Sequence, residues 1–252
     1  MIQLDGVGMR YPRGVVALQP THLTFHRGHF TVLLGPSGAG KSTLLRCLNF
    51  LNNPTCGRVI VEGIGKICLE SKCLRELRRT TGVIFQQHQL ITGQTALKNV
   101  LVGRLGEYSS FRSLFPLPGY EREFALECLE RVGLLDKALK RVDNLSGGEQ
   151  QRVGIARALA QKPQMILADE PVASLDPATA DDVLSLLHQI TKEDVIPAIV
   201  SLHQVEFAKK YADRIVGLSA GSVVFDGSPQ RLTSEILQQI YHEKKIRAAE
   251  AA

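Results

Sequence analysis

The feature that most constrains the fold is a glycine-rich stretch between an apolar run and a helix-compatible segment. The apolar run is Thr31-Val32-Leu33-Leu34, and the helix-compatible segment begins at Leu44. This order is the strand, loop and helix context that the phosphate-binding pattern G-x-x-x-x-G-K-[ST] requires. The loop consists of Gly35, Pro36, Ser37, Gly38, Ala39, Gly40, Lys41, Ser42 and Thr43.

Each part of this loop has a chemical reason. The glycines allow consecutive backbone N–H groups to converge on one point, and the helix that follows adds the positive end of its dipole there. We expect Lys41 to reach the β- and γ-phosphates of a nucleotide and the Ser42 hydroxyl to ligate Mg²⁺. The alternative is a chance glycine-rich turn, but the complete pattern favours a nucleoside triphosphate site.

Length and composition are those of an ordinary globular protein. The chain has 252 residues, 44% of them hydrophobic and 22% charged, which suits one or two domains. No run approaches the about 18 apolar residues that span a bilayer, and the first residues lack a signal-peptide pattern, so we expect the protein to remain in the cytoplasm. The five cysteines include no C-x-x-C pair, which argues against a zinc site or a disulfide framework.

Two further surface signals are less specific. The net charge of +5 fits an anionic partner or a solvated face equally well. His22, His26 and His29 lie close together in sequence, which suggests a metal site. They have no cysteine or carboxylate neighbour in the sequence pattern, so we interpret them as structural histidines.

Apolar segments alternate with amphipathic ones through most of the chain. Strands are expected near residues 2–7, 23–25, 30–34, 58–61, 82–85, 165–168, 198–201, 215–218 and 222–226. Buried strands that alternate with helices predict an α/β fold, with a mostly parallel sheet covered on both faces. We expect one domain over 1–252, with a core of about 1–87 and 162–228, an inserted helical subdomain of about 88–161 and a C-terminal helix of about 229–248.

Two carboxylates follow the apolar strand that ends at Ala168. A carboxylate at the end of a buried strand can hold Mg²⁺ beside the phosphates, and we assign this role to Asp169. Glu170 can act as the general base that polarises the attacking water. A strand that simply meets solvent is the alternative, and the phosphate loop upstream favours the catalytic interpretation.

The stretch from Leu145 to Gln150 supports two compatible interpretations. Ser146 and Glu149 have the S-x-x-E spacing of a capping box, which predicts the start of a helix. Gly147 and Gly148 lie at the same helix start, and a helix N-terminus is also an anion site. A capped and exposed helix start is therefore what a phosphate from another subunit would meet.

The order of these motifs resembles the ATP-binding-cassette ATPase family, and the similarity covers nearly the whole chain. The motifs, in order, are the phosphate loop, Gln86, Leu145-Ser146-Gly147-Gly148, Asp169-Glu170, Ser174-Leu175-Asp176 and His203. The resemblance implies a P-loop NTPase (RecA-like) core, an antiparallel β subdomain and an inserted α-helical subdomain. It also implies a head-to-tail homodimer that binds ATP and Mg²⁺ between the phosphate loop of one subunit and Ser146, Gly147 and Gly148 of the other.

The resemblance assigns roles to four further residues. Tyr11 matches the aromatic residue that stacks on adenine. Taken without the resemblance, Tyr11 is interpreted as an ordinary half-buried tyrosine. Gln86 matches the glutamine that senses Mg²⁺ and the attacking water, and His203 matches the histidine that contacts the γ-phosphate. Asp176 matches the residue that communicates across the dimer, and it can also cap the helix that follows.

One position departs from the commonest family residue. Position 149 is glutamate, where glutamine is usual. Glutamate completes the capping box equally well, but it adds a negative charge near the expected ATP phosphates. We assign Glu149 no catalytic role, and its effect on phosphate binding stays open.

The segments 99–106 and 111–115 are similar to ATP-binding subunits of phosphonate importers, as are 85–87 and 168–177. This resemblance implies a peripheral subunit at the cytoplasmic face of the inner membrane. Its partners would be an integral-membrane permease dimer and, indirectly, a substrate-binding protein, with no nucleic acid. The transported solute would be phosphonate or a related phosphorus oxyanion, such as phosphite or a phosphate ester. The alternatives are an importer ATPase for another solute and a soluble cassette protein that assists a carbon–phosphorus lyase complex. A nucleic-acid or ribosome-associated cassette ATPase usually needs two cassettes or a long coiled-coil insertion, and the sequence has neither.

Overall fold

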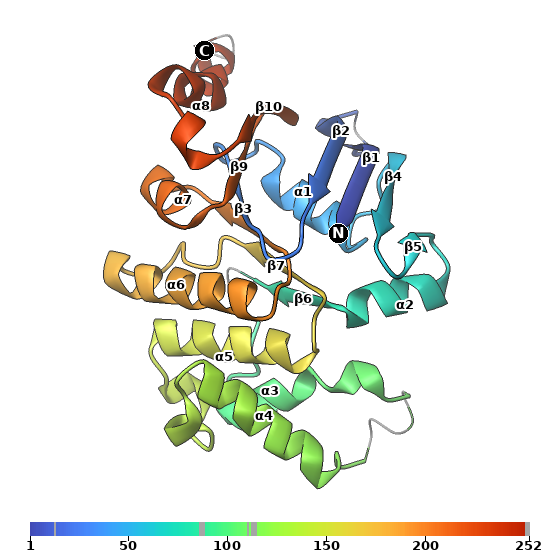
Figure 1. The fold of residues 1–252 in the computed structure, drawn as a ribbon, viewed down its shortest axis with the longest axis vertical. Coiled ribbons are helices and arrows are strands. Elements are labelled where there is room, and N and C mark those ends of the chain that lie inside the picture. The colour runs from blue at the N-terminus through green and yellow to red at the C-terminus, as the bar shows by residue number, and fades with distance from the viewer. Residues whose placement is uncertain (13, 86–88, 110, 112–114, 250–252) are drawn as a thin grey trace.

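The computed structural model describes residues 1–12, 14–85, 89–109, 111 and 115–249, with side chains through Tyr241. Figure 1 shows a central sheet with helices on both of its faces, and a second, smaller sheet near the N-terminus. The predicted α/β fold with a mostly parallel sheet and an antiparallel β unit is confirmed.

The central sheet has six strands in the order β10-β9-β3-β8-β7-β6. All neighbours are parallel except β10 and β9, which form an antiparallel edge pair. The strands are β3 (Phe30–Leu34), β6 (Thr81–Ile84), β7 (Met165–Asp169), β8 (Ala198–Leu202), β9 (Arg214–Ser219) and β10 (Ser222–Gly227). Because parallel strands end at one edge, β3, β7 and β8 present their following residues at the same place.

The second sheet is antiparallel, in the order β2-β1-β4-β5. Its strands are β1 (Ile2–Arg10), β2 (Val16–Phe25), β4 (Cys56–Val61) and β5 (Gly65–Lys66). The sequence predicts only parts of β1, β2 and β4 and does not predict the two-residue β5. β1 and β2 carry exposed positions and register shifts that weaken the alternating pattern.

Two apolar cores cover the two faces of the central sheet. Alternate residues of one strand point to opposite faces, so Leu33 packs in one core while Val32 and Leu34 pack in the other. The core that contains Leu33 also contains residues of the small sheet. The core that contains Val32 and Leu34 contains residues of most of the helices. Burial on both faces explains why the parallel strands read as continuous apolar runs.

The helices alternate with the strands along much of the chain. They are α1 (Lys41–Leu48), α2 (Ser71–Arg79), α3 (Ala96–Val102), α4 (Gly119–Arg131), α5 (Gly147–Ala160), α6 (Pro177–Glu193), α7 (Val205–Tyr211) and α8 (Ser234–Ala249). Short 3-10 turns are η1 (Leu105–Glu107), η3 (Leu135–Lys137), η4 (Val142–Asn144) and η5 (Pro229–Arg231). In the described part of the chain, no helix has the length and hydropathy that a membrane span needs.

The described residues from 89 to 161 form helices, 3-10 turns and loops, and the only β pairing among them is an isolated bridge between Thr95 and Arg141. Figure 1 places α3, α4 and α5 together at one end of the molecule. The C-terminal helix starts at Ser234, later than the expected 229, because Pro229–Arg231 forms a separate 3-10 turn.

Candidate functional site

The glycine loop connects β3 to α1 at the edge where the parallel strands end. Gly40 precedes α1 with φ of +104°, and a Cβ on it would lie 2.6 Å from the carbonyl oxygen of Ala17. A side chain is therefore excluded there by both conformation and space. No side chain in the described residues caps α1, and such a helix start presents N–H groups and the positive dipole end to an anion.

Lys41 lies inside the curve of this loop. Its side chain is buried, and Nζ donates hydrogen bonds to the carbonyl oxygens of Gly35 at 2.8 Å and Pro36 at 3.1 Å. Ser37 and Gly38 are exposed at the tip of the loop. The loop thus holds an ammonium group beside a helix N-terminus, an arrangement that suits phosphate oxygens.

Ser42 and Asp169 come together across 127 residues of sequence. The Ser42 hydroxyl donates a hydrogen bond of 2.8 Å to Oδ1 of Asp169. Both groups supply oxygen atoms, which are the ligands that Mg²⁺ prefers. The two described residues that the sequence pattern proposes for the metal are therefore adjacent.

Glu170 has an unusual backbone conformation at the end of β7. Its φ is +50°, in the left-handed region that non-glycine residues rarely adopt. Its carboxylate Oε1 lies 2.5 Å from Nε2 of His203, and the two side chains are 19% and 39% exposed. Strained residues of this kind cluster at functional sites, and a carboxylate held by an imidazole beside solvent can accept a proton from water.

Ser201 joins these groups and was not among the residues expected from the sequence. Its hydroxyl donates to Oδ1 of Asp169 at 2.8 Å and accepts the backbone N–H of Glu170, also at 2.8 Å. Ser201 is fully buried in β8 and lies opposite Asp169 in the strand register. The available signal was a hydroxyl in the apolar run Ala198-Ile199-Val200, since a buried polar group needs partners.

A small cavity of about 110 Å³ lies beside this cluster. The cavity is lined by Glu170, Ser201 and His203, together with residues of the turn after Glu170 and of α7. The geometry therefore places the proposed base and the histidine at one opening.

The remaining expected nucleotide contacts have different outcomes. Tyr11 follows β1, is half-buried, and its hydroxyl accepts a hydrogen bond of 2.9 Å from the Asn52 amide. Its backbone N–H donates to the carbonyl oxygen of Val15 at 2.9 Å, which forms a turn. Gln86 lies outside the described residues.

The predicted capping box at α5 is confirmed. The Ser146 hydroxyl accepts the backbone N–H of Glu149 at 3.3 Å, and Oε2 of Glu149 accepts the backbone N–H of Ser146 at 2.7 Å. Lys137 donates a further hydrogen bond to Oε1 of Glu149. Hydrogen bonds from Lys137 and from the Ser146 backbone lower the pKa of Glu149, and the same pairing raises the pKa of Lys137.

The start of α5 rests on the start of α6. A Cβ on Gly148 would lie 2.3 Å from Cγ2 of Thr179, so this close approach requires glycine. Asp176 caps α6, because its Oδ1 accepts the Thr179 N–H at 3.1 Å. The hydrogen bonds from Thr179 lower the pKa of Asp176.

The structure therefore forms two separate groups of site residues. Ser146, Gly147 and Asp176 are exposed near one another. Figure 1 shows that the phosphate loop at the start of α1 lies apart from α5, with the central sheet between them. Within one chain, Ser146-Gly147-Gly148 does not reach the phosphate loop.

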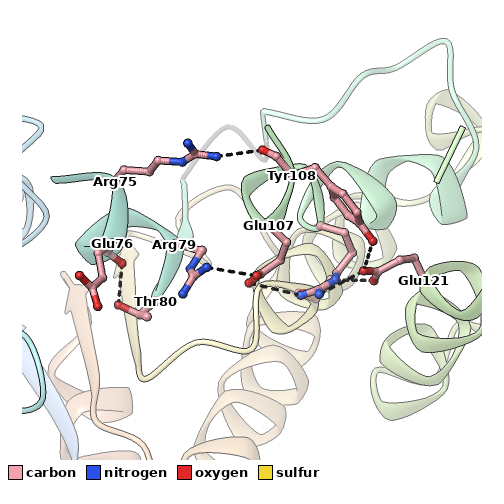
Figure 2. Close-up of polar contacts among 9 residues, drawn as sticks. Arg75, Glu76, Arg79, Thr80, Glu107, Tyr108 and Glu121 are labelled. Atoms are coloured by element: carbon pink, nitrogen blue, oxygen red, sulfur yellow. Dashed lines mark hydrogen bonds and ion pairs between the residues drawn. The ribbon is translucent and has the colours of Figure 1, made fainter. Parts of the chain in front are cut away.

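A groove of about 410 Å³ lies between α2 and the segment that follows α3. It is lined by Ser71, Leu74, Arg75, Arg78, Arg79, Val102, Gly103, Gly106, Glu107 and Gln161. Figure 2 shows arginines of α2 reaching across to this segment: Arg75 donates to the Tyr108 carbonyl oxygen at 2.9 Å, and Arg79 donates to the Glu107 carboxylate at 3.3 Å.

A buried ion pair anchors the far side of the groove. Arg104 Nε donates to Oε2 of Glu121 at 2.6 Å, and the Tyr108 hydroxyl donates to Oε1 of Glu121 at 2.7 Å. Burial opposes ionisation of Glu121, but the hydrogen bonds from Arg104 and Tyr108 outweigh it and lower the pKa of this carboxyl.

The three clustered histidines contact a carboxylate or one another. His22 lies 3.2 Å from a carboxylate oxygen of Asp5, a neighbour that the sequence pattern did not reveal, and His26 packs against His29. Among the described residues, no group of three or more His, Cys, Asp or Glu side chains is placed to hold a metal ion.

The glycine loop, the strand-end carboxylates and the capped helix start define a nucleotide-binding cassette. The ABC transporter family profile matches residues 18–173. The chain belongs to the ABC transporter family.

Relatives that match almost the whole chain narrow the comparison. The chain is 61% identical to the phosphonates import ATP-binding protein PhnC 3 of Nostoc sp. (strain PCC 7120), over 96% of this chain and 92% of that relative. It is 60% identical to the phosphite import ATP-binding protein PxtA of Stutzerimonas stutzeri, over 96% of this chain and 87% of that relative.

Solved structures have the same fold. The dimeric post-hydrolysis state of the ATP-binding cassette MJ0796 bound to ADP and Pi has a TM-score of 0.79 and 36% identity, covering 92% of this chain and all of that one. A nucleotide-free cassette from an ABC transporter has a TM-score of 0.80 and 25% identity, covering 95% of this chain and 94% of that one.

Proposed function

We propose that this chain is the ATP-binding subunit of an importer for phosphonate or a related phosphorus oxyanion such as phosphite. The observation that carries the proposal is the near-full-length similarity to a phosphonate and a phosphite import ATP-binding protein. Identities of 61% and 60% do not separate these two substrates. The substrate class is therefore an oxyanion of phosphorus.

In this proposal each ATP binds between two copies of the chain arranged head to tail. One copy supplies the phosphate loop with Lys41, and Tyr11 stacks on adenine. The other copy supplies Ser146, Gly147 and Gly148 at the start of α5, with Asp176 beside them. The distance between these two groups in one chain supports this arrangement, as does the similarity to a dimeric cassette bound to ADP and Pi.

Ser42 and Asp169 would hold Mg²⁺, with Gln86 as a third expected ligand. The fit rests on the donor set, since a hydroxyl and a carboxylate already lie 2.8 Å apart at the loop. When bound, the ion supplies positive charge that offsets the charge of the phosphates.

Hydrolysis is assigned to the cluster at the end of β7. Glu170 accepts a proton from the attacking water, and its contact with His203 orients the carboxylate. His203 then also contacts the γ-phosphate, and Gln86 senses the water. Ser201 holds the Glu170 backbone and the Asp169 carboxylate in one arrangement.

The groove beside α2 is the proposed docking surface for a permease dimer. It lies between the core and the helical block of about 88–161, so a partner seated there contacts both parts. ATP binding then draws the two subunits together and hydrolysis releases them. The proposed location is the cytoplasmic face of the inner membrane. A substrate-binding protein would act on this chain only indirectly, through the permease. Nucleic acid has no role in this proposal.

The test is transport and ATPase activity in vesicles that contain the purified chain and its permease. Binding protein loaded with phosphonate or with phosphite is added to separate samples. We expect ATP-dependent uptake and stimulated hydrolysis with at least one of them, and loss of both with Glu170→Gln. Co-purification with a carbon–phosphorus lyase complex and no membrane subunit would instead support the alternative function.

A further inference from the structure

The first turn of α5 carries a carboxylate at the helix start that is assigned to the phosphates of ATP. Glu149 is the third residue of the turn after Ser146, and its Oε2 accepts the Ser146 N–H at 2.7 Å. A negative side chain stabilises a helix N-terminus. The same charge repels a triphosphate that approaches this turn. The negative charge of Glu149 therefore stabilises the helix start but disfavours the binding of ATP there.

Lys137, which lies outside the helix, pairs with Glu149 and offsets its charge without removing the helix cap. It is the last residue of η3 (Leu135–Lys137), twelve positions before Glu149, and its ammonium group donates a hydrogen bond to Oε1 of Glu149. The two side chains are 35% and 23% exposed, so the pair lies at the surface where a second subunit would dock. Each oxygen of the Glu149 carboxylate is thus held by a separate donor.

The neighbouring cation is engaged elsewhere. Arg152 donates to the Val132 carbonyl oxygen at 3.4 Å and lies 3.8 Å from the Asp182 carboxylate. Among the described residues, Lys137 is the cation that forms an ion pair with Glu149. The electrostatic balance at the start of α5 therefore depends on this lysine.

We propose that Lys137 is a positioning residue of the shared ATP site, which neutralises Glu149 and keeps its carboxylate on the Ser146 backbone. With Lys137 in place, the start of α5 offers its N–H groups to the partner's ATP without an uncompensated negative charge. This inference rests on the proposed function, because it requires ATP to be bound between two subunits. It adds a residue outside every motif that the sequence pattern identified.

The experiment measures ATP-dependent dimerisation by sedimentation in the Glu170→Gln background, where hydrolysis does not release the dimer. The variants are Lys137→Met, Lys137→Arg, Glu149→Gln and the double variant Lys137→Met/Glu149→Gln. We expect Lys137→Met to weaken dimerisation about tenfold at low salt, as one uncompensated charge near phosphates does. The defect should shrink at high salt, where partly exposed charges are screened.

The other variants separate charge compensation from simple structural support. Lys137→Arg keeps the charge and should dimerise like the parent, and the double variant should regain parental dimerisation because the carboxylate is gone. Binding of a fluorescent ATP analogue to the dilute monomer should be equal in all variants, because the phosphate loop is in the other half-site. Thermal unfolding curves check that every variant is folded.

Three outcomes contradict the inference, and one of them also contradicts the proposed function. Parental dimerisation of Lys137→Met at low salt, or failure of Glu149→Gln to rescue it, shows that Lys137 does not act through charge compensation. If the Glu170→Gln parent itself stays monomeric with ATP and Mg²⁺, the shared site of the proposed function is wrong and this inference falls with it.

Discussion

Replacement of Glu121 by glutamine should destabilise the protein strongly, because the buried guanidinium of Arg104 then loses its nearer counter-ion and keeps only the more distant Glu107 carboxylate. Arg104 and Glu121 have side chains that are only 8% and 4% exposed. Glu121 accepts hydrogen bonds from Arg104 Nε at 2.6 Å, from Arg104 Nη2 at 3.3 Å and from the Tyr108 hydroxyl at 2.7 Å. The substitution keeps the shape of the side chain and removes its charge.

The magnitude follows from what Arg104 retains. It still donates to the Ala160 carbonyl oxygen at 2.8 Å, and the Glu107 carboxylate lies 3.9 Å away. Removing one partner of a buried ion pair costs about 3–5 kcal/mol. Because the glutamine oxygen still accepts one hydrogen bond, we expect about 3 kcal/mol of the free energy of unfolding to be lost. For a chain of this size that lowers Tm by roughly 6–12 °C.

Urea denaturation and calorimetry measure this change directly. The urea midpoint should fall while the m-value stays constant. The matched control is Asp143→Asn in the Arg141–Asp143 pair, whose side chains are 57% and 38% exposed, and it should leave Tm unchanged. A loss below about 1 kcal/mol for Glu121→Gln would refute the reasoning that this buried pair needs both charges.

The same pair gives a pH dependence with a defined sign. The folded-state pKa of Glu121 lies below its ordinary value, because hydrogen bonds from Arg104 and Tyr108 outweigh the effect of burial. Its contribution to stability is therefore complete above the unfolded-state pKa and is lost as pH falls through the folded-state pKa. The difference in stability between the wild type and Glu121→Gln should be constant near neutral pH and shrink below about pH 4.

The remaining predictions concern the site. Glu170→Gln should bind ATP and accumulate as a dimer with turnover reduced about 10²–10⁴-fold, and near-normal phosphate release would remove Glu170 from the general-base role. Ser201→Ala should lower the free energy of unfolding by about 1–3 kcal/mol and reduce kcat, because it leaves the partly buried N–H of Glu170 without its partner. Ser201→Thr, which keeps the hydroxyl, is the control, and an unchanged kcat in Ser201→Ala would contradict the linking role. Gly148→Ala should lower Tm through its overlap with Cγ2 of Thr179, and Thr179→Ser in the same chain should restore it; a failure to restore Tm would place the cause elsewhere.

The parts of this protein that the sequence predicts are those that depend on neighbouring residues. The phosphate loop is one continuous stretch, and Ser146 and Glu149 form their capping box within one helical turn. The apolar runs of β3, β7 and β8 are buried on both faces, so their composition alone indicates a parallel sheet. Local hydrogen bonding and side-chain periodicity determine each of these features, and both can be read from residue order.

Tertiary structure alone decides the contacts between distant segments. Ser201 was an ordinary residue of an apolar run until β8 aligned it with Asp169. Lys137 belongs to no sequence motif, and its contact with Glu149 depends on the placement of η3 beside α5. Strand order in the central sheet differs from order along the chain, because crossover connections and packing of two cores select the neighbours. Such contacts depend on which segments the folded chain brings together, and a linear sequence does not display that.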